Sequence, residues 1–242
     1  MEKMLAELVG TALLVLLGNG VVAGVLLSRS KSQNAGWIVI AMGWGLALAI
    51  AVYAVGSISG AHLNPAITIG QLVIGGIDAA DAAMYIIGQF VGAFLGALLV
   101  WLHYLPHWGA TEDPGLKLAA FSTGPAIRST PANLAAEAIG TFVLAFGVSA
   151  ILLPANDVGG LGGLIIGGLL MAIGLSLGGP TGYAVNPARD LAPRIAHAIL
   201  PIAGKGDSDW AYAWVPVVGP LIGGVLGAVT FSVLYGPGLL GS

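Results

Sequence analysis

The sequence predicts an all-α membrane protein with six transmembrane helices and two re-entrant half-helices arranged as an inverted repeat. Three observations lead to this prediction. The composition is apolar with few charges, six apolar segments have the length of a membrane span, and the tripeptide Asn-Pro-Ala occurs once in each half of the chain.

The composition identifies the bilayer as the solvent of this chain. Only 8% of its 242 residues are charged and 57% are hydrophobic, whereas soluble domains carry about 25% charged residues. The mean hydropathy is +0.94. The net charge of −3, without any basic run, argues against nucleic acid as a partner. The absence of cysteine excludes disulfides, thiolate metal sites and cysteine nucleophiles.

Six segments reach the roughly 20 apolar residues that a spanning helix needs: 5–27, 36–56, 82–104, 131–153, 160–179 and 211–235. Two shorter apolar stretches, 65–76 and 187–200, reach about half of a ~30 Å hydrocarbon core. They are predicted to be re-entrant half-helices, and surface loops or interfacial helices are the alternative. The polar, proline-containing segment 105–130 is predicted to be a linker between the two halves.

The two halves repeat each other. "AELVGT" at residue 6 matches "AEAIGT" at 136, and "GSISGAHLNPA" at 56 matches "GGPTGYAVNPA" at 178. A glycine ladder occurs in both halves, at positions 88, 92, 96 and at 219, 223, 227. Each half holds three spans, an odd number, so the second half must enter the membrane from the opposite side. We therefore expect one domain over 1–242, with a first inverted repeat at 1–110 and a second at 131–242, whose site lies near the midplane.

The Asn-Pro-Ala tripeptides are expected to begin the two half-helices. Asparagine is a strong N-cap and proline is favoured at the first helical position. In an inverted repeat the two helix starts meet at the midplane, where their positive dipole ends oppose cations and protons. The asparagine amides can then donate hydrogen bonds to small neutral hydroxylated solutes. The residues concerned are Asn64, Pro65, Ala66, Asn186, Pro187 and Ala188.

Two glutamates, Glu7 and Glu137, stand at equivalent positions in the first span of each half. Intramembrane carboxylates are costly and usually functional. They could relay protons or accept hydrogen bonds from the backbone of the re-entrant loops, and their duplication favours this structural role. We assign Asp190, two residues after Ala188 of the second motif, to the same supporting group. The glycine ladders indicate close helix packing.

With these features the sequence resembles the major intrinsic proteins, the family of aquaporins and glycerol facilitators. The resemblance covers essentially the whole chain and is carried by "SGAHLNPA", "TGYAVNPARD", the two AExxGT repeats and the glycine ladders. It implies a right-handed bundle of six tilted helices and two half-helices with one pore per protomer. It also implies a homotetramer in the plasma membrane, with both termini in the cytoplasm.

Within that family the chain is similar to the glycerol-facilitator branch. Asp190 after "NPAR", the following Arg194, and Pro216-Val217 in place of two aromatic residues all point to this branch. The resemblance implies a narrow selectivity filter made of Trp44, Gly174, Tyr183 and Arg189.

Three filter positions carry particular expectations. Water-specific members tend to have histidine in place of Gly174, so glycine is expected to widen the constriction. Many glycerol facilitators have phenylalanine where this chain has Tyr183, so its hydroxyl makes the filter more polar. Arg189 is expected to donate to solute hydroxyls, and the alternative is an interfacial arginine.

Backbone carbonyls of the two re-entrant loops are expected to line the channel as acceptors. We expect the His62 side chain to be a hydrogen-bonded loop residue rather than a gate. The carbonyls concerned are those of Gly60, Ala61, His62, Leu63, Tyr183, Ala184 and Val185.

The predicted function is a passive channel for glycerol and other small uncharged solutes, which also passes water and excludes ions and protons. The alternatives are a channel for undissociated small acids such as lactic acid, a mainly water-selective aquaporin and, with less support, a coupled secondary transporter. Urea, dihydroxyacetone and hydrogen peroxide are further candidate solutes, and the sequence does not rank them. No nucleophile–base pair, metal-ligand cluster or phosphate loop is visible, so we expect neither enzymatic activity nor a cofactor or metal.

The basic residues conflict with the expected orientation. Cytoplasmic termini leave Lys3 as the one cytoplasmic basic residue outside the helices, although cytoplasmic loops usually carry the excess of Lys and Arg. We prefer the orientation of the family, because an inverted repeat weakens a simple count over loops. The basic residues then expected outside are Arg29, Lys31, Lys117, Arg128, Arg194 and Lys205.

Overall fold

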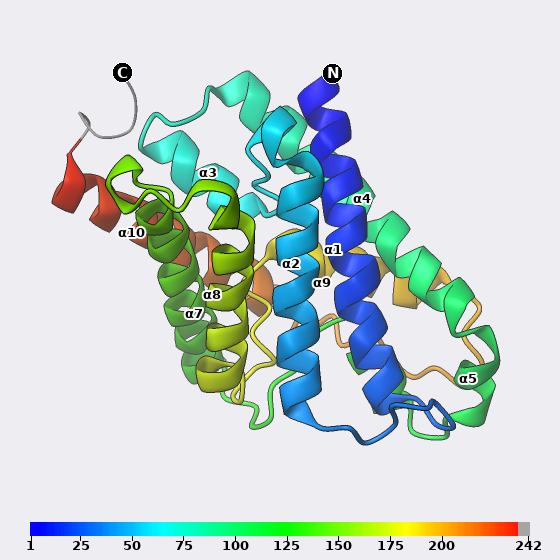
Figure 1. The fold of residues 1–242 in the computed structure, drawn as a ribbon. Coiled ribbons are helices and arrows are strands. Elements are labelled where there is room, and N and C mark those ends of the chain that lie inside the picture. The colour runs from blue at the N-terminus through cyan, green and yellow to red at the C-terminus, as the bar shows by residue number, and fades with distance from the viewer. Residues whose placement is uncertain (237–242) are drawn as a thin grey trace.

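The computed structural model describes residues 1–236, and this range contains helices and no strand. The last six residues of the predicted second repeat, 237–242, lie outside the described range. Figure 1 shows the helices in chain order: α1 Glu2–Leu26, α2 Trp37–Ser59, α3 Pro65–Val73, α4 Ala79–His103, α5 Leu105–Ala110, α6 Pro114–Ala119, α7 Thr130–Ile151, α8 Gly162–Leu177, α9 Pro187–Ile199 and α10 Val215–Tyr235. Two short 3₁₀ turns, η1 Pro154–Asn156 and η2 Gly159–Leu161, connect α7 to α8.

Six helices are long and apolar enough to cross a bilayer: α1, α2, α4, α7, α10, and α8 together with the preceding turn η2 (Gly159–Leu177). Helices α3 and α9 have only 9 and 13 residues. At 1.5 Å per residue they extend roughly 14 and 20 Å, well short of a ~30 Å hydrocarbon core. The prediction of six spanning helices and two half-helices is therefore confirmed.

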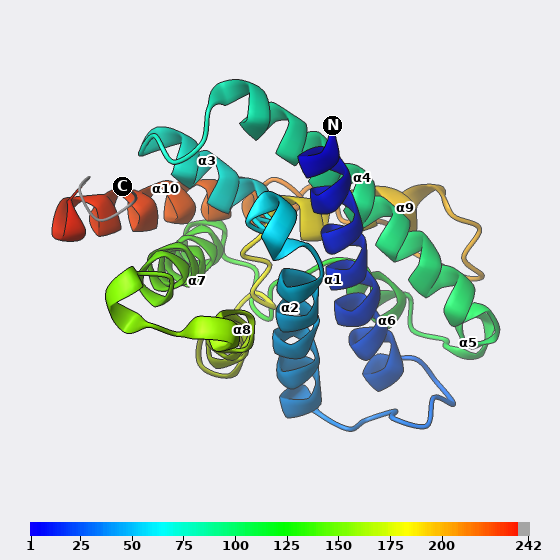
Figure 2. The ribbon, with the colours of Figure 1, turned by 45° about the horizontal axis from the view of Figure 1, so that its top comes forward.

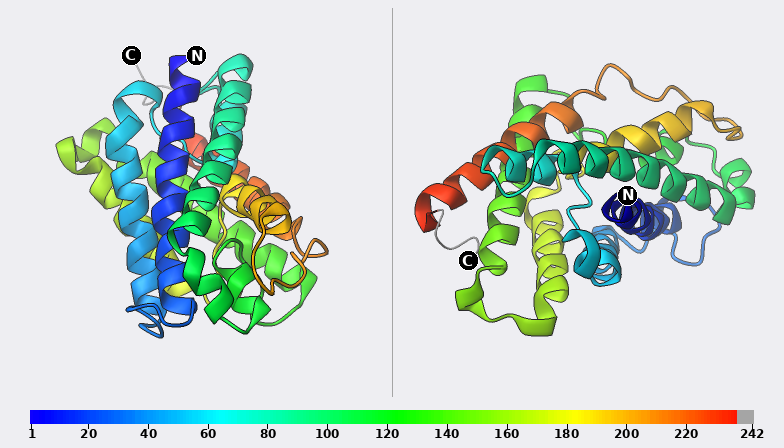
Figure 3. Two further views of the ribbon diagram at one scale, coloured as in Figure 1. Left: turned by 90° about the vertical axis from the view of Figure 1, so that its right-hand side faces the viewer. Right: turned by 90° about the horizontal axis from the view of Figure 1, so that it is seen from above.

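The two halves of the chain run in opposite directions. In Figure 1, α1 descends from the marked N-terminus, whereas α7, the first helix of the second half, ascends. Each half-helix packs against the last spanning helix of the other half, α3 against α10 and α9 against α4. Figure 2 and the two views of Figure 3 show these two exchanged pairs from different sides. This exchange holds the two half-helices in the middle of the bundle.

The glycine ladders bring the first and last spanning helices of each half into backbone contact, α1 with α4 and α7 with α10. A Cβ on Gly96 of α4 would lie 2.6 Å from the carbonyl oxygen of Ala12 in α1. A Cβ on Gly227 of α10 would lie 2.7 Å from the carbonyl oxygen of Phe142 in α7. Ala12 and Phe142 are 130 residues apart, the offset of the AExxGT repeat, so both halves use the same contact. Small residues at such positions allow helices to approach closely in a membrane.

The segment 105–130 is more than the linker that we predicted from the sequence. It contains α5 and α6, each with a proline in its first turn, and Asp113 caps α6 by accepting a hydrogen bond from the Gly115 N–H at 2.7 Å. Trp108 and Phe121 are buried in a core cluster, and the Phe121 carbonyl accepts a hydrogen bond from Asn19 Nδ2 at 3.0 Å. The expectation of a simple linker was wrong because α5 and α6 have six residues each, which is too short to show a helical period in the sequence.

Four of the six basic residues counted as external are bonded to the protein itself. Arg128 forms an exposed ion pair with Asp209. Lys205 Nζ donates to the carbonyls of His197, Ala198 and Leu200 at 2.6–2.8 Å, at the end of α9. Lys117, which is 2% exposed, donates to the Ala203 carbonyl at 2.5 Å. These lysines, together with the buried Arg194, serve as internal hydrogen-bond donors. A count of basic residues in loops therefore overstates the charge that faces solvent.

Candidate functional site

The two Asn-Pro-Ala tripeptides begin the two half-helices, and their asparagines are the N-caps, as predicted. Asn64 is the N-cap of α3, and its Oδ1 accepts a hydrogen bond from the Ala66 N–H at 2.9 Å. Asn186 is the N-cap of α9, and its Oδ1 accepts hydrogen bonds from the N–H groups of Ala188 and Arg189 at 3.0 and 3.2 Å. Each side-chain oxygen is thus directed into its own helix, so each amide nitrogen points out of it.

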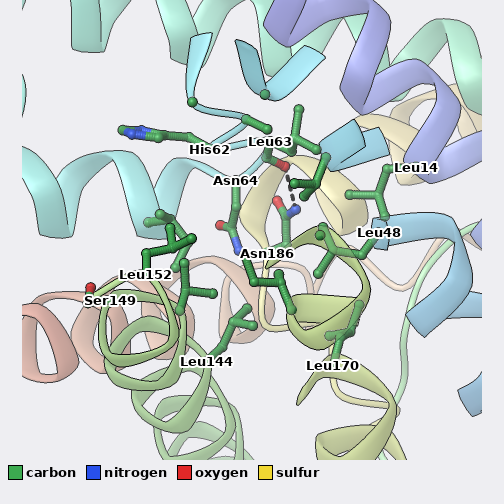
Figure 4. Close-up of a pocket in the computed structure, with 18 of the residues that line it drawn as sticks. Leu14, Leu48, His62, Leu63, Asn64, Leu144, Ser149, Leu152, Leu170 and Asn186 are labelled. Atoms are coloured by element: carbon green, nitrogen blue, oxygen red, sulfur yellow. Dashed lines mark hydrogen bonds between the residues drawn. The ribbon is translucent and has the colours of Figure 1, made fainter. Parts of the chain in front are cut away.

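The amide nitrogens cross between the two halves. Asn64 Nδ2 donates to the Val185 carbonyl, and Asn186 Nδ2 donates to the Leu63 carbonyl, each at 2.8 Å. Figure 4 shows the two amides side by side in the middle of the cavity, with the second of these bonds drawn. An asparagine amide has two N–H donors, so each side chain retains one for a solute. The midplane therefore offers two fixed donors.

The loops that precede the caps have an uncommon backbone conformation. Ala61 and Leu63 have φ values of 53°, and Tyr183 and Val185 have φ values of 40° and 43°. Left-handed conformations of this kind cost non-glycine residues of the order of 1–3 kcal/mol each unless their surroundings hold them. All seven residues whose carbonyls were expected to be acceptors line the central cavity. The carbonyls of Leu63 and Val185 already accept the asparagine amides and so have one lone pair left for a solute.

The two intramembrane glutamates hold these loops through hydrogen bonds to the backbone. Glu7 accepts from the N–H groups of His62 and Leu63 at 2.9 and 2.6 Å. Glu137 accepts from the N–H groups of Ala184 and Val185 at 2.9 and 2.8 Å. Hydrogen bonds to a charged acceptor contribute about 1.5–3 kcal/mol. They therefore offset the conformational cost of the left-handed residues.

The first glutamate has two further partners that the sequence analysis did not identify. Ser59 Oγ donates to Glu7 at 2.6 Å, and Gln89 Nε2 of α4 donates to it at 2.8 Å. Gln89 follows Gly88 of the glycine ladder and is fully buried. A lone glutamine in an apolar span is the signal that could have revealed this bond. Pro220 occupies the equivalent position in the second half, so the two supports differ.

His62 is a hydrogen-bonded residue of the first loop. Its Nδ1 lies 3.1 Å from Thr68 Oγ1, and its ring packs edge-on against Tyr85 at a centroid distance of 5.0 Å. Figure 4 shows the ring pointing away from the two asparagines. This arrangement agrees with an anchoring role.

Three of the four expected filter residues lie at the wall of the cavity. Trp44, Tyr183 and Arg189 all line it. The guanidinium carbon of Arg189 lies 4.0 Å from the centre of a Trp44 ring, and Arg189 is 6% exposed. Arg189 forms no ion pair within the described part of the chain. Its charge is thus available at the cavity.

Gly174 lies behind the filter rather than at its surface. A Cβ on Gly174 would lie 2.8 Å from Tyr183 Cζ and 3.0 Å from its Oη. The tyrosine ring therefore fills the space above the glycine. We expected glycine by itself to widen the constriction. The structure corrects this expectation, because the space left by the missing side chain is occupied by the Tyr183 ring.

Asp190 connects α9 to the segment that was taken for a linker. Its Oδ2 accepts from the N–H and the Oγ1 of Thr123 at 2.6 and 2.7 Å, and its Oδ1 pairs with Arg194 at 2.8 Å. Arg194 also donates to the carbonyls of Thr123 and Ser208, at 2.7 and 2.8 Å. Asp190 and Arg194 are completely buried. No sequence signal marks Thr123, because its role depends on contacts between distant segments.

The cavity that these residues line has a volume of about 1000 Å³. One part of its wall is polar, made of the asparagine amides and the loop backbone. Figure 4 shows leucine side chains around the asparagines: Leu14, Leu48, Leu144, Leu152 and Leu170. Polar groups on one side and aliphatic groups on the other match a molecule with hydroxyl groups along a carbon chain. Within residues 1–236, no three His, Asp or Glu side chains gather into a metal-binding group.

The sequence model of the family described as "Major intrinsic protein" matches residues 1–231. The chain belongs to this family. Among the relatives of this major intrinsic protein are a "Probable glycerol uptake facilitator protein" of Thermotoga maritima and a "Glycerol uptake facilitator protein" of Bacillus subtilis. The first is 59% identical over 97% of this chain and all of that protein. The second is 56% identical over 95% of this chain and 83% of that protein.

A solved structure gives the same result for the fold. The X-ray structure of the aquaglyceroporin from Plasmodium falciparum matches this major intrinsic protein with a TM-score of 0.83. The match covers 98% of both chains at 28% sequence identity. The predicted aquaporin-like fold is therefore confirmed, and the protein is a multi-pass membrane protein.

Proposed function

We propose that this protein is a passive channel for glycerol and other small uncharged solutes, which also passes water and excludes ions and protons. The observation that carries the proposal is the pair of cross-bonded asparagines. Their free amide donors lie at the starts of two opposed half-helices, inside a cavity with an aliphatic wall. Relatives at 59% and 56% identity that are named glycerol uptake facilitators support the same substrate.

In the proposed mechanism a solute exchanges its water shell for fixed groups of the pore. Its hydroxyl groups accept hydrogen bonds from Asn64 and Asn186 and donate to the loop carbonyls, while its carbon chain passes along the leucines. Cations meet the positive ends of α3 and α9 and the charge of Arg189, so their binding is disfavoured. Protons are excluded by the same field.

Trp44, Tyr183 and Arg189 form the proposed filter, with Gly174 as the position that admits the tyrosine ring. The two rings would contact the carbon chain, and the arginine would donate to adjacent hydroxyl groups. Glu7, Glu137 and Asp190 act in this proposal as supports that keep the loops in place. None of the three changes its protonation during transport.

We further propose a homotetramer in the plasma membrane, with both termini in the cytoplasm. Large apolar side chains on the outer faces of the helices support contact with lipid or with other protomers, for example Leu46 and Ile50 of α2, which are 52% and 50% exposed. The internal bonds of Lys117, Arg194 and Lys205 reduce the conflict with the count of basic residues, because these three side chains are bound within the protein. Arg29, Lys31 and Arg128 remain outside against Lys3 inside, so the proposed orientation rests on the family.

Stopped-flow light scattering on proteoliposomes tests the function. The solutes are glycerol, urea, dihydroxyacetone, hydrogen peroxide, lactic acid at low pH, and water. We expect glycerol permeability well above that of empty liposomes, without dependence on a proton gradient. High water permeability with glycerol at background would favour a water-selective channel, and saturable proton-driven accumulation would favour a coupled transporter. Lactic acid permeability above that of glycerol would favour the acid channel.

Replacing Gly174 with histidine tests the filter. The new side chain must displace the Tyr183 ring, because the first side-chain carbon already collides with it. Gly174→His should therefore reduce glycerol permeability more than water permeability. Equal losses of both would place the filter elsewhere.

A further inference from the structure

Trp37 stands at the start of α2, outside the set of filter residues, and contacts two of them. Its indole Nε1 donates a hydrogen bond to the Gly174 carbonyl at 2.8 Å. Its ring packs edge-on against the Tyr183 ring, with a centroid distance of 5.7 Å and an interplanar angle of 78°. One side chain thus binds both the helix behind the filter and the ring in front of it.

The rings of Tyr183 and Trp37 pack against two glycines at the C-terminal end of α8, where any side chain would collide with them. A Cβ on Gly178 would lie 2.5 Å from Tyr183 Cδ1 and 2.8 Å from Trp37 Cζ2. A Cβ on Gly174 would lie 2.8 Å from Tyr183 Cζ. The two glycines are four residues apart, so they lie on the same face of the helix. Together they form a groove that holds the tyrosine on one side and the tryptophan next to it.

The first repeat has no such arrangement. At the offset of 122 residues, the counterparts of Gly174, Gly178 and Tyr183 are Val52, Gly56 and Ala61. One glycine is common to both halves, but the ring and the second glycine belong to the second half alone. The pair of glycines with its two rings is therefore specific to the second half and is not part of the shared helix packing.

We infer that Trp37 is a positioning residue for the filter: it holds the Tyr183 ring against α8 and so sets the width of the constriction. The inference rests on the proposed filter. Without Trp37, the Gly174 carbonyl loses its indole donor and the Tyr183 ring gains space on the side away from the pore. The ring then moves back toward α2, and the constriction becomes wider.

The experiment measures the permeability of a four-carbon polyol, of glycerol and of water for Trp37→Ala and Trp37→Phe in proteoliposomes. Trp37→Ala should raise the ratio of polyol to water permeability about threefold or more, roughly 0.7 kcal/mol at 1.4 kcal/mol per tenfold. Trp37→Phe keeps a ring and loses the N–H donor, so its ratio should lie in between. Trp210→Ala is the matched control, because Trp210 is another partly exposed tryptophan, in the loop before α10, and its loss should leave the ratio unchanged.

The double variant Trp37→Ala/Tyr183→Ala separates the inference from the filter proposal. If Trp37 acts through Tyr183, its replacement should change the ratio little once Tyr183 is absent, as in a double-mutant cycle. A changed ratio in Tyr183→Ala with none in Trp37→Ala would overturn the inference and leave the filter standing. An undiminished Trp37 effect without Tyr183, or a proportional loss of all permeabilities in both Trp37 variants, would also overturn it. Unchanged ratios in every variant would reject the filter itself.

Discussion

Replacing Glu7 with glutamine tests the idea that the intramembrane carboxylates support the loops. The carboxylate accepts four hydrogen bonds: Oε1 from Ser59 Oγ and the His62 N–H, and Oε2 from the Leu63 N–H and Gln89 Nε2. A glutamine has one acceptor oxygen and one NH₂ group in the same space. Whichever way its amide is oriented, one of the two backbone N–H groups faces another donor.

The size of the effect follows from these four bonds. An orphaned buried N–H costs about 1–3 kcal/mol, and bonds to a neutral acceptor are about 1 kcal/mol weaker than bonds to a charged one. Two of the four bonds remain and lose their charge assistance, and a third can re-form only if Ser59 or Gln89 reorients to accept from the new NH₂ group. We therefore expect a destabilisation of about 3 kcal/mol. For a chain of this size that corresponds to a fall in Tm of roughly 6–12 °C.

The assay compares Glu7→Gln with Glu2→Gln, which changes an exposed glutamate in the same helix. Thermal unfolding in detergent and stopped-flow permeability in proteoliposomes are measured for both. Glu7→Gln should lower Tm and reduce water and glycerol permeability together, while proton permeability stays at the level of the native protein. Native stability and permeability in Glu7→Gln would refute the supporting role. Loss of a proton-coupled uptake would instead identify Glu7 as a relay.

Two further substitutions test the packing and the outer loops. Gly223→Ala would place a methyl group 2.9 Å from the Ala138 carbonyl carbon and should destabilise the α7–α10 contact by about 1–3 kcal/mol. Gly168→Ala, with nothing within 4 Å of its Cβ, is the control, and equal Tm values in the two variants would contradict the role of the ladder. Arg194→Met leaves the buried Asp190 unpaired, which should lower the free energy of unfolding by about 3–5 kcal/mol. Tm should fall accordingly, and solute selectivity should change. A native Tm in thermal unfolding would show that the pair is dispensable.

The spans and the half-helices could be predicted from the sequence, because each depends on neighbouring residues. A run of about 20 apolar residues indicates a spanning helix whatever it packs against. Asn64 and Pro65 indicate an N-cap and a first helical residue whatever lies around them. The regular spacing of Gly88, Gly92 and Gly96 likewise marks a contact face before its partner is known. The resemblance to a known family then indicated which residues to expect in a filter.

The tertiary structure alone decided which distant groups meet. The bond from Asn64 to the Val185 carbonyl joins residues 121 positions apart, and the bond from the Thr123 N–H to Asp190 joins residues 67 apart. Such pairs have no local pattern, because they join segments that only the fold brings together. The same holds for the ring of Tyr183 above Gly174. From the sequence a glycine is only an absent side chain, and the fold determines whether the space it leaves stays open or is filled by a neighbour.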